Sequence, residues 1–184
     1  MSATPPKKLH IVLACIAGLV LSVVGWTFSV KHSLHTQLDA IHGSWHHLED
    51  HFPDRYSVIF LIESLPLTLS DSAKTTLVRL KTNYDTLRYS QKTLENIGLF
   101  NQLEQDLHVL LSVLPQAAAT QKIRNRLSGT QIQINFERRQ FNEHVRFFNR
   151  NIQKFPNRYV TQLSGFITLP YLELFLLDEK GHES

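Results

Sequence analysis

The apolar residues of this chain recur with the period of an α-helix. The clearest stretch is FNEHVRFFNRNIQKFP, residues 141–156, where successive apolar residues lie four, three, four and three positions apart. These residues are Phe141, Val145, Phe148, Ile152 and Phe155. At about 100° per residue their side chains form one stripe. We therefore expect a long last helix over residues 121–155, with this stripe facing the core.

Two asparagines, Asn142 and Asn149, lie seven residues apart on the flank of that stripe. An amide at a heptad-spaced position can bond to a neighbouring helix and fix the register of a coiled-coil-like contact. We expect this role for both side chains.

The rest of the chain shows the same period. A stripe from Leu34 to Phe52 predicts a helix that ends before Pro53, and Ser70 or Asp71 is a suitable cap for the next helix. We expect that helix to carry residues 77–94 and to break at Gly98, with a further helix over residues 99–114. Alternation of the kind that strands show is missing. The pattern predicts an all-α fold, an antiparallel bundle of about four long helices.

The first apolar run differs from these stripes because it is apolar on every side. Leu9–Val30 contains 22 residues without Asp, Glu, Lys or Arg. At about 1.5 Å per residue such a helix spans the roughly 30 Å hydrocarbon layer of a membrane. We interpret it as a retained transmembrane helix that continues into the bundle. A lipoprotein signal cut at Cys15 is the competing interpretation, and the short apolar run before Cys15 disfavours it.

Basic residues around this run predict its orientation. Lys7 and Lys8 precede it and Lys31 alone follows directly, which places residues 1–8 in the cytoplasm and the bundle in the periplasm or outside the cell. Small residues spaced by four form one face of the run: Ala14, Gly18 and Ser22. Such a face allows close contact with a second copy or with another membrane protein.

Charge is unevenly distributed. Residues 31–121 contain 7 Lys or Arg and 10 Asp or Glu, whereas residues 122–158 contain 9 and 2. Four basic residues share the face of the last helix opposite its apolar stripe: Arg139, Arg146, Arg150 and Lys154. We interpret them as a solvated surface or as a contact with anionic headgroups. Nucleic acid is not an expected partner, because the phenylalanines point inward rather than outward for base stacking.

Six of the ten histidines fall between residues 32 and 51. His42 and His46 are one helical turn apart, with Asp39 on the same side, so two imidazoles and a carboxylate are placed to bind zinc or copper. A solvated polar face and a charge switch between about pH 5 and 7 are the other interpretations. The single cysteine, Cys15, excludes an intrachain disulfide and a thiolate metal site.

Common catalytic and nucleotide-binding motifs are missing. The chain has no G-x-x-x-x-G-K-[ST], G-x-G-x-x-G or G-x-S-x-G sequence. We therefore expect neither an enzyme nor a bound cofactor.

Three stretches near the C-terminal end, residues 127–139, 141–156 and 165–173, together resemble the signature of the LemA family of membrane-anchored helical proteins. The residues that carry the resemblance are Phe141, Asn142, Val145, Phe148, Asn149, Ile152, Phe155, Pro156, Gly165 and Phe166. The resemblance implies structural roles for them, and partners among membrane proteins such as envelope peptidases.

These observations predict four segments: a cytoplasmic segment (1–8), a transmembrane anchor (9–30), a helical bundle (31–156) and a C-terminal tail (157–184) that packs on the bundle or touches lipid. The expected function is that of a non-catalytic, single-pass protein of the inner membrane. Its bundle would interact with or regulate other membrane and envelope proteins, as a monomer or a homo-oligomer. The alternative is a metal-binding or pH-responsive envelope protein that uses the histidine-rich helix.

Overall fold

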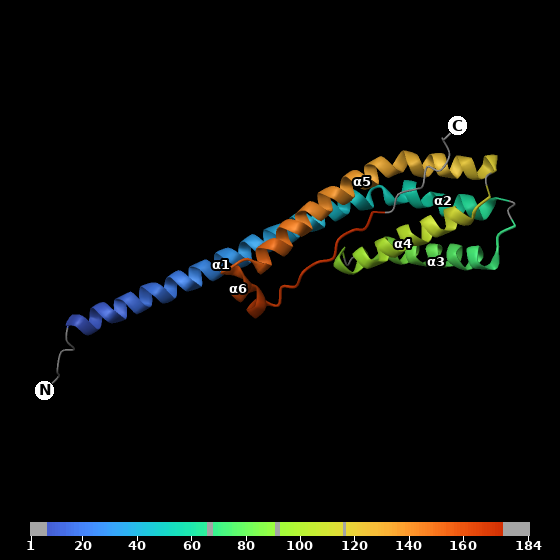
Figure 1. The fold of residues 1–184 in the computed structure, drawn as a ribbon. Coiled ribbons are helices and arrows are strands. Elements are labelled where there is room, and N and C mark those ends of the chain that lie inside the picture. Colours follow the sequence, from blue (N-terminus) through green and yellow to red (C-terminus); the bar gives the residue numbers. More distant parts are fainter. Residues whose placement is uncertain (1–6, 66–67, 91–92, 116, 175–184) are drawn as a thin grey trace. The chain divides into compact units, whose positions relative to one another are not determined.

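The computed structural model describes residues 7–65, 68–90, 93–115 and 117–174. Within these ranges the chain forms helices and no strand, so the all-α prediction is confirmed (Figure 1). The helices are α1 (Lys7–Glu49), α2 (Phe52–Ser64), α3 (Asp71–Tyr89), α4 (Thr93–Val113), α5 (Ala118–Gln153) and α6 (Asn157–Ser164).

The chain divides into two compact units. The first, which we call the anchor unit, contains residues 1–39 and 147–168, and the second, the bundle unit, contains residues 40–146 and 169–184. The long helices α1 and α5 each contribute to both units. The expected helix over residues 121–155 is α5.

An aromatic cluster forms the centre of the bundle unit. The Trp45 indole of α1 makes edge-to-face contacts with Phe52 of α2, Phe100 of α4 and Phe141 of α5, at centroid distances of 5.9, 6.2 and 5.9 Å. All four side chains are buried. Aromatic pairs in this geometry add to the stabilisation that their buried area supplies. One tryptophan thus joins four helix segments.

The start of α3 agrees with the sequence, but its end does not. The Ser70 hydroxyl accepts a hydrogen bond from the Ala73 N–H at 3.2 Å and caps the helix. The predicted break at Gly98 is wrong, because α4 passes through Gly98. The chain leaves the helical conformation earlier, at Ser90, so Leu94 belongs to α4 rather than α3. A glycine inside a helix costs only about 1 kcal/mol, which packing can offset.

Four members of the α5 stripe are buried: Phe141, Val145, Phe148 and Ile152. Phe155 was expected to extend the stripe, but this expectation is wrong. It lies beyond the last residue of α5, Gln153, and is 69% exposed.

In the anchor unit, α6 and the end of α5 pack on the part of α1 that follows the apolar run. Asn151 Nδ2 donates to Gln37 Oε1 at 3.0 Å, and the His35 ring contacts Phe166 edge-on at 5.6 Å. Trp26 and Thr27 are half-buried and Val30 is buried, whereas the side chains of residues 9–25 are exposed. The C-terminal motif is therefore folded against the first turns after the apolar run.

Candidate functional site

A buried ion pair crosses the bundle unit. The Arg55 guanidinium of α2 donates from Nε to Glu104 Oε1 at 2.7 Å and from Nη2 to Oε2 at 2.5 Å. The Tyr56 hydroxyl donates to Glu104 Oε1 at 2.7 Å. Burial alone lowers the pKa of Arg55, but the adjacent Glu104 carboxylate outweighs it and the pKa is raised. Burial, followed by the Glu104 charge, raises the pKa of Tyr56 well above its ordinary value.

Two α5 side chains complete this cluster. Arg55 Nη1 donates to Thr130 Oγ1 at 3.3 Å and Nη2 donates to Gln131 Oε1 at 3.0 Å. The cluster thus ties α2, α4 and α5 together through bonds between its own members. Shifted pKa values also occur in structural ion pairs. Because its members bond one another, we assign the cluster a structural role, which is to hold α2, α4 and α5 together.

A second bidentate pair joins α3 to α4. Arg79 donates to both Asp106 oxygens, from Nε at 2.7 Å and from Nη2 at 2.5 Å, and Gln102 Nε2 donates to Asp106 Oδ1 at 3.0 Å. Sequence reasoning missed both pairs. The available signal was Glu104 and Asp106, two acids set among the leucines of α4, because a carboxylate on an apolar face needs a cationic partner.

An extended segment of the C-terminal region lies between two asparagines. Asn142 Nδ2 donates to the Leu172 carbonyl at 2.9 Å, and its Oδ1 accepts from the Leu172 N–H at 2.8 Å. Asn101 of α4 bonds the Tyr171 carbonyl at 3.1 Å and the Glu173 N–H at 2.9 Å. We call this arrangement the asparagine clamp. Asn142 was expected to bond a neighbouring helix, and this is corrected: it holds a non-helical segment. Residues 175–184 lie outside the described part of the chain.

The other motif residues have local structural positions. Asn149 is buried in the anchor unit. Pro156 directly precedes α6, and Gly165 ends it in the left-handed conformation with φ of 73°, which favours glycine. The Phe166 ring packs edge-on against Phe148 at 6.2 Å.

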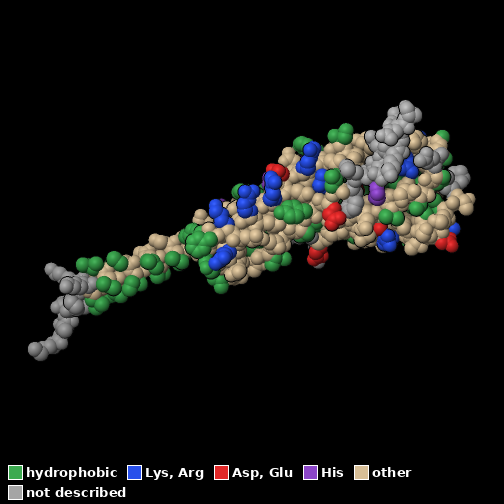
Figure 2. Space-filling view, in the orientation of Figure 1, with side chains coloured by type: hydrophobic (Ala, Val, Ile, Leu, Met, Phe, Trp, Pro, Cys, Tyr) green, Lys and Arg blue, Asp and Glu red, His purple; other side chains and the backbone are tan. Residues whose placement is uncertain are grey.

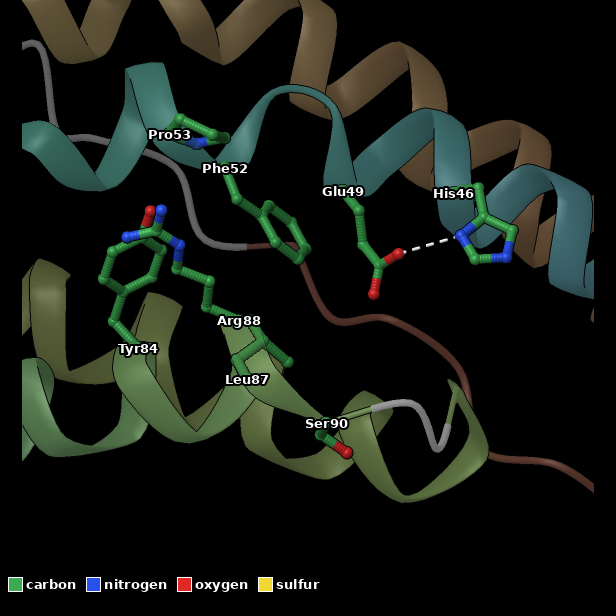
Figure 3. A pocket seen from close by; sticks show the side chains of 8 residues that line it. All are labelled: His46, Glu49, Phe52, Pro53, Tyr84, Leu87, Arg88 and Ser90. Atoms are coloured by element: carbon green, nitrogen blue, oxygen red, sulfur yellow. Dashed lines mark hydrogen bonds and ion pairs between the residues drawn. The ribbon is translucent and has the colours of Figure 1, made fainter.

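A pocket of about 540 Å³ opens in the bundle unit between the α1–α2 junction and α3. Figure 3 shows Glu49 and His46 at one end, Tyr84 and Arg88 at the other, and the Phe52 ring between them. His46 Nδ1 and Glu49 Oε2 are 2.9 Å apart, and Glu49 also accepts from the Trp45 indole.

The pocket combines an apolar lining with charged groups at both ends. Its apolar lining includes Phe52 and Pro53 of α2 and Leu87 of α3, while Arg88 and Glu49 supply opposite charges. Burial raises the pKa of Tyr84, and the positive charge of Arg88 offsets part of this rise. Apolar residues combined with a few polar or charged groups are typical of binding pockets.

The predicted metal set is not assembled. Among the described residues, no three His, Cys, Asp or Glu side chains are grouped as metal ligands, so His42, His46 and Asp39 do not converge on one point. The reason is local: His46 turns toward Glu49, one turn further along α1.

The basic and small-residue faces are exposed. Arg139, Arg146, Arg150 and Lys154 all point to the surface, and Figure 2 shows a row of Lys and Arg side chains along α5. Arg146 pairs with Glu143 at 2.8 Å. In α1, the face formed by Ala14, Gly18 and Ser22 is uncovered, and the Ser22 hydroxyl donates to the Gly18 carbonyl of its own helix at 2.8 Å.

One helix among the described residues is long and apolar enough to cross a membrane, and the other described residues leave its most apolar stretch, at the start of α1, exposed. Length and composition thus make it a candidate membrane span.

The LemA family model matches residues 71–182, which include α3 to α6 and the asparagine clamp. No curated protein and no solved structure matched the chain. The LemA family is not known as a family of enzymes. The match extends over more than half of the 184 residues, and it agrees with the helical fold and the candidate membrane span, so the chain belongs to the LemA family.

Proposed function

We propose that this chain is a non-catalytic, single-pass protein of the inner membrane whose helical bundle binds and regulates other membrane or envelope proteins. The observation that carries the proposal is the difference in burial between the two parts of α1. Its first part is apolar on all sides and exposed, while Leu34, Ile41 and Trp45 in its second part are buried in folded units. A helix with an uncovered apolar surface of this length needs lipid around it.

The proposed segments are a cytoplasmic stretch (1–8), an anchor (9–30), a bundle (31–156) and a C-terminal tail (157–184). The excess of lysine before the apolar run supports a cytoplasmic start and a bundle outside the cytoplasm. The non-catalytic assignment is supported by the buried charges, because Arg55 and Glu104 form an ion pair with each other and Arg55 also bonds Thr130 of α5.

The pocket beside Phe52 is the proposed contact for a partner. Its opposite charges at Glu49 and Arg88 would orient a side chain whose apolar part contacts the apolar lining. A second copy of the chain and a different membrane protein can both supply such a side chain.

Orientation is tested with a membrane-impermeant maleimide on spheroplasts. The native Cys15 is replaced by serine, and Val78→Cys places a thiol on the exposed surface of α3. Labelling of intact spheroplasts is expected. Labelling only after lysis would place the bundle in the cytoplasm and overturn the proposal.

Partner binding is tested with a photoreactive amino acid at Arg88, which lines the pocket, and at Lys122, an exposed control on α5. The expected result is one membrane protein captured in native membranes from Arg88 but not from Lys122. A reciprocal probe on that protein should return to the pocket. Identical capture patterns at both positions would contradict a specific site.

A further inference from the structure

The anchor unit exposes a group of large apolar side chains at its C-terminal part. Leu163 is 90% exposed, Ile167 73% and Phe155 69%, and Tyr159 is about half exposed. Tyr159 and Leu163 lie four residues apart on α6, so they share one face, and the Phe155 ring contacts the Tyr159 ring at 6.1 Å. We call these four residues the α6 patch. An exposed apolar group of this kind marks a contact surface.

The patch is held in place by the other side of α6. Val160 and Thr161 are buried, and the Thr161 hydroxyl donates to the Ile152 carbonyl of α5 at 2.9 Å. After Gly165, the Phe166 N–H donates to the Thr161 carbonyl at 3.1 Å, and the Phe166 ring packs inward on Phe148. The helix is therefore fixed with one face inward and its apolar patch outward.

The charged residues around the patch are all basic. Residues 147–168 contain Arg150, Lys154 and Arg158 and no Asp or Glu. All three basic side chains are exposed, and the Arg158 guanidinium lies 5.0 Å from the centre of the Tyr159 ring. Figure 2 shows Lys and Arg side chains next to hydrophobic ones in this part of the molecule. Apolar and aromatic side chains bordered by cations are typical of surfaces that lie in the membrane interface.

The anchor unit also fixes how far the patch lies from the apolar run. Phe166, next to the exposed Ile167, contacts His35, which is five residues after Val30. At a rise of 1.5 Å per residue this is about 8 Å beyond the end of the apolar run. The headgroup layer on each side of the hydrocarbon is of the same order, roughly 5–8 Å. The C-terminal part of the anchor unit is therefore level with the lipid headgroups once α1 spans the bilayer.

We propose that α6 and its flanking residues form a second membrane contact. The α6 patch inserts into the interfacial layer of the leaflet from which α1 emerges, and Lys154 and Arg158 bind anionic phospholipid headgroups. This inference rests on the proposed transmembrane role of α1. The patch then restrains the tilt of α1, because the folded anchor unit touches the membrane at two places.

Depth-dependent quenching in nanodiscs tests the contact with the full chain. Discs contain phosphatidylcholine and phosphatidylglycerol, with nitroxide groups either near the headgroup or deep in the acyl chain. An environment-sensitive label on the native Cys15 reports insertion of α1. In a Cys15→Ser background, Leu163→Cys and Ile167→Cys report the patch, and Val78→Cys, on α3 and 65% exposed, is the matched control in the bundle unit.

Shallow nitroxides are expected to reduce the fluorescence at residues 163 and 167 by about twofold, with little effect at residue 78. Deep nitroxides should quench the label at Cys15. Labels at residues 163 and 167 that stay as bright as the one at residue 78, while Cys15 is quenched, would overturn the patch and leave the anchor intact. An unquenched Cys15 would overturn the proposed function itself.

The charge contribution is tested by Lys154→Glu with Arg158→Glu. This variant is expected to lose most of the quenching at residue 163 in discs with phosphatidylglycerol, and to change little in discs of phosphatidylcholine alone. The control, Lys122→Glu with Arg126→Glu, makes the same charge change at exposed positions of α5 in the bundle unit. Equal effects of the two double variants would contradict a local headgroup contact.

Discussion

The two parts of α1 present their apolar side chains in different ways. Over residues 9–25 apolar side chains surround the helix and stay exposed, whereas from Val30 onward they form a stripe that is buried: Val30, Leu34, Ile41, Trp45 and Leu48. The difference is the width of the apolar surface. A stripe needs one protein neighbour, while a helix that is apolar all round needs a lipid or protein environment on every side. The chain carries two tryptophans, Trp26 directly after the exposed part and Trp45 in the buried stripe.

The largest effect is expected for Trp45→Ala. This change removes the side chain that joins α1 to α2, α4 and α5, and should lower the free energy of unfolding by about 3–5 kcal/mol. Urea unfolding in detergent, followed by circular dichroism, measures it. Trp26→Ala is the matched control, and membrane association should survive in both variants. Equal destabilisation by the two changes would remove the distinction between the parts.

An arginine in the first part is expected to act on the membrane rather than on the bundle. Leu21 is exposed near the middle of the apolar run, and Leu21→Arg should oppose insertion by about 2.5–3.5 kcal/mol. Alkaline extraction of membranes measures the fraction that remains inserted. The urea midpoint of the bundle should not change, and a large shift would mean that Leu21 packs against the folded part.

The asparagine clamp is expected to stabilise only the folded bundle. Asn142→Ala removes both hydrogen bonds to Leu172 and should cost about 1–3 kcal/mol, because these backbone groups lose their partners. Limited proteolysis should then cut near residues 169–174 at lower protease concentration. Asn125→Ala, at an exposed α5 position, serves as the control. Unchanged cleavage would show that the clamp contributes little.

Alkaline pH should weaken the bundle through its buried tyrosine. Burial raises the pKa of Tyr56 above its ordinary value of about 10, so above pH 10 the folded state retains a proton that the unfolded chain has lost. The stability that this raised pKa contributes is fully present below about pH 10 and is lost as the pH rises further. Tyr56→Phe should cost about 1 kcal/mol at pH 7 and flatten the alkaline decline. Parallel pH profiles for the two proteins would contradict this assignment.

The smallest intramolecular effect is expected for Gly18→Ile. A Cβ atom built at Gly18 has nothing within 4 Å beyond the adjacent backbone of its own helix, so bundle stability should not change. Any change must come from another molecule at the face of Ala14, Gly18 and Ser22. Cross-linking through the neighbouring Cys15 compares the dimer yields of the two proteins. Equal yields would argue against self-association through this face.

Much of the fold was predictable because helix period and caps are local signals. The apolar run, the α5 stripe and the Ser70 cap all follow from residues within a few turns of one another. The break between α3 and α4 did not, since Leu87 and Leu94 are seven residues apart and imitate a continuous helix. Period cannot distinguish one long helix from two in this case.

The polar contacts were less predictable because their partners are distant in sequence. Arg55 lies 49 residues from Glu104, and Asn142 lies 30 residues from Leu172. The helical position of Asn142 was clear from the sequence, but its partner is a peptide group, which every residue carries. Pro156 disfavours the helical conformation at Phe155, but the sequence did not show that α5 would end at Gln153 and leave the ring exposed.

The asparagine clamp also has a consequence for how the sequence can diverge. Asn101 and Asn142 bind the peptide groups of residues 171–173, so they do not distinguish one side chain from another. Homologous chains are free to exchange these three residues, with burial restricting only Leu172. The exception is proline at position 172 or 173, because proline has no N–H to offer the amide oxygen.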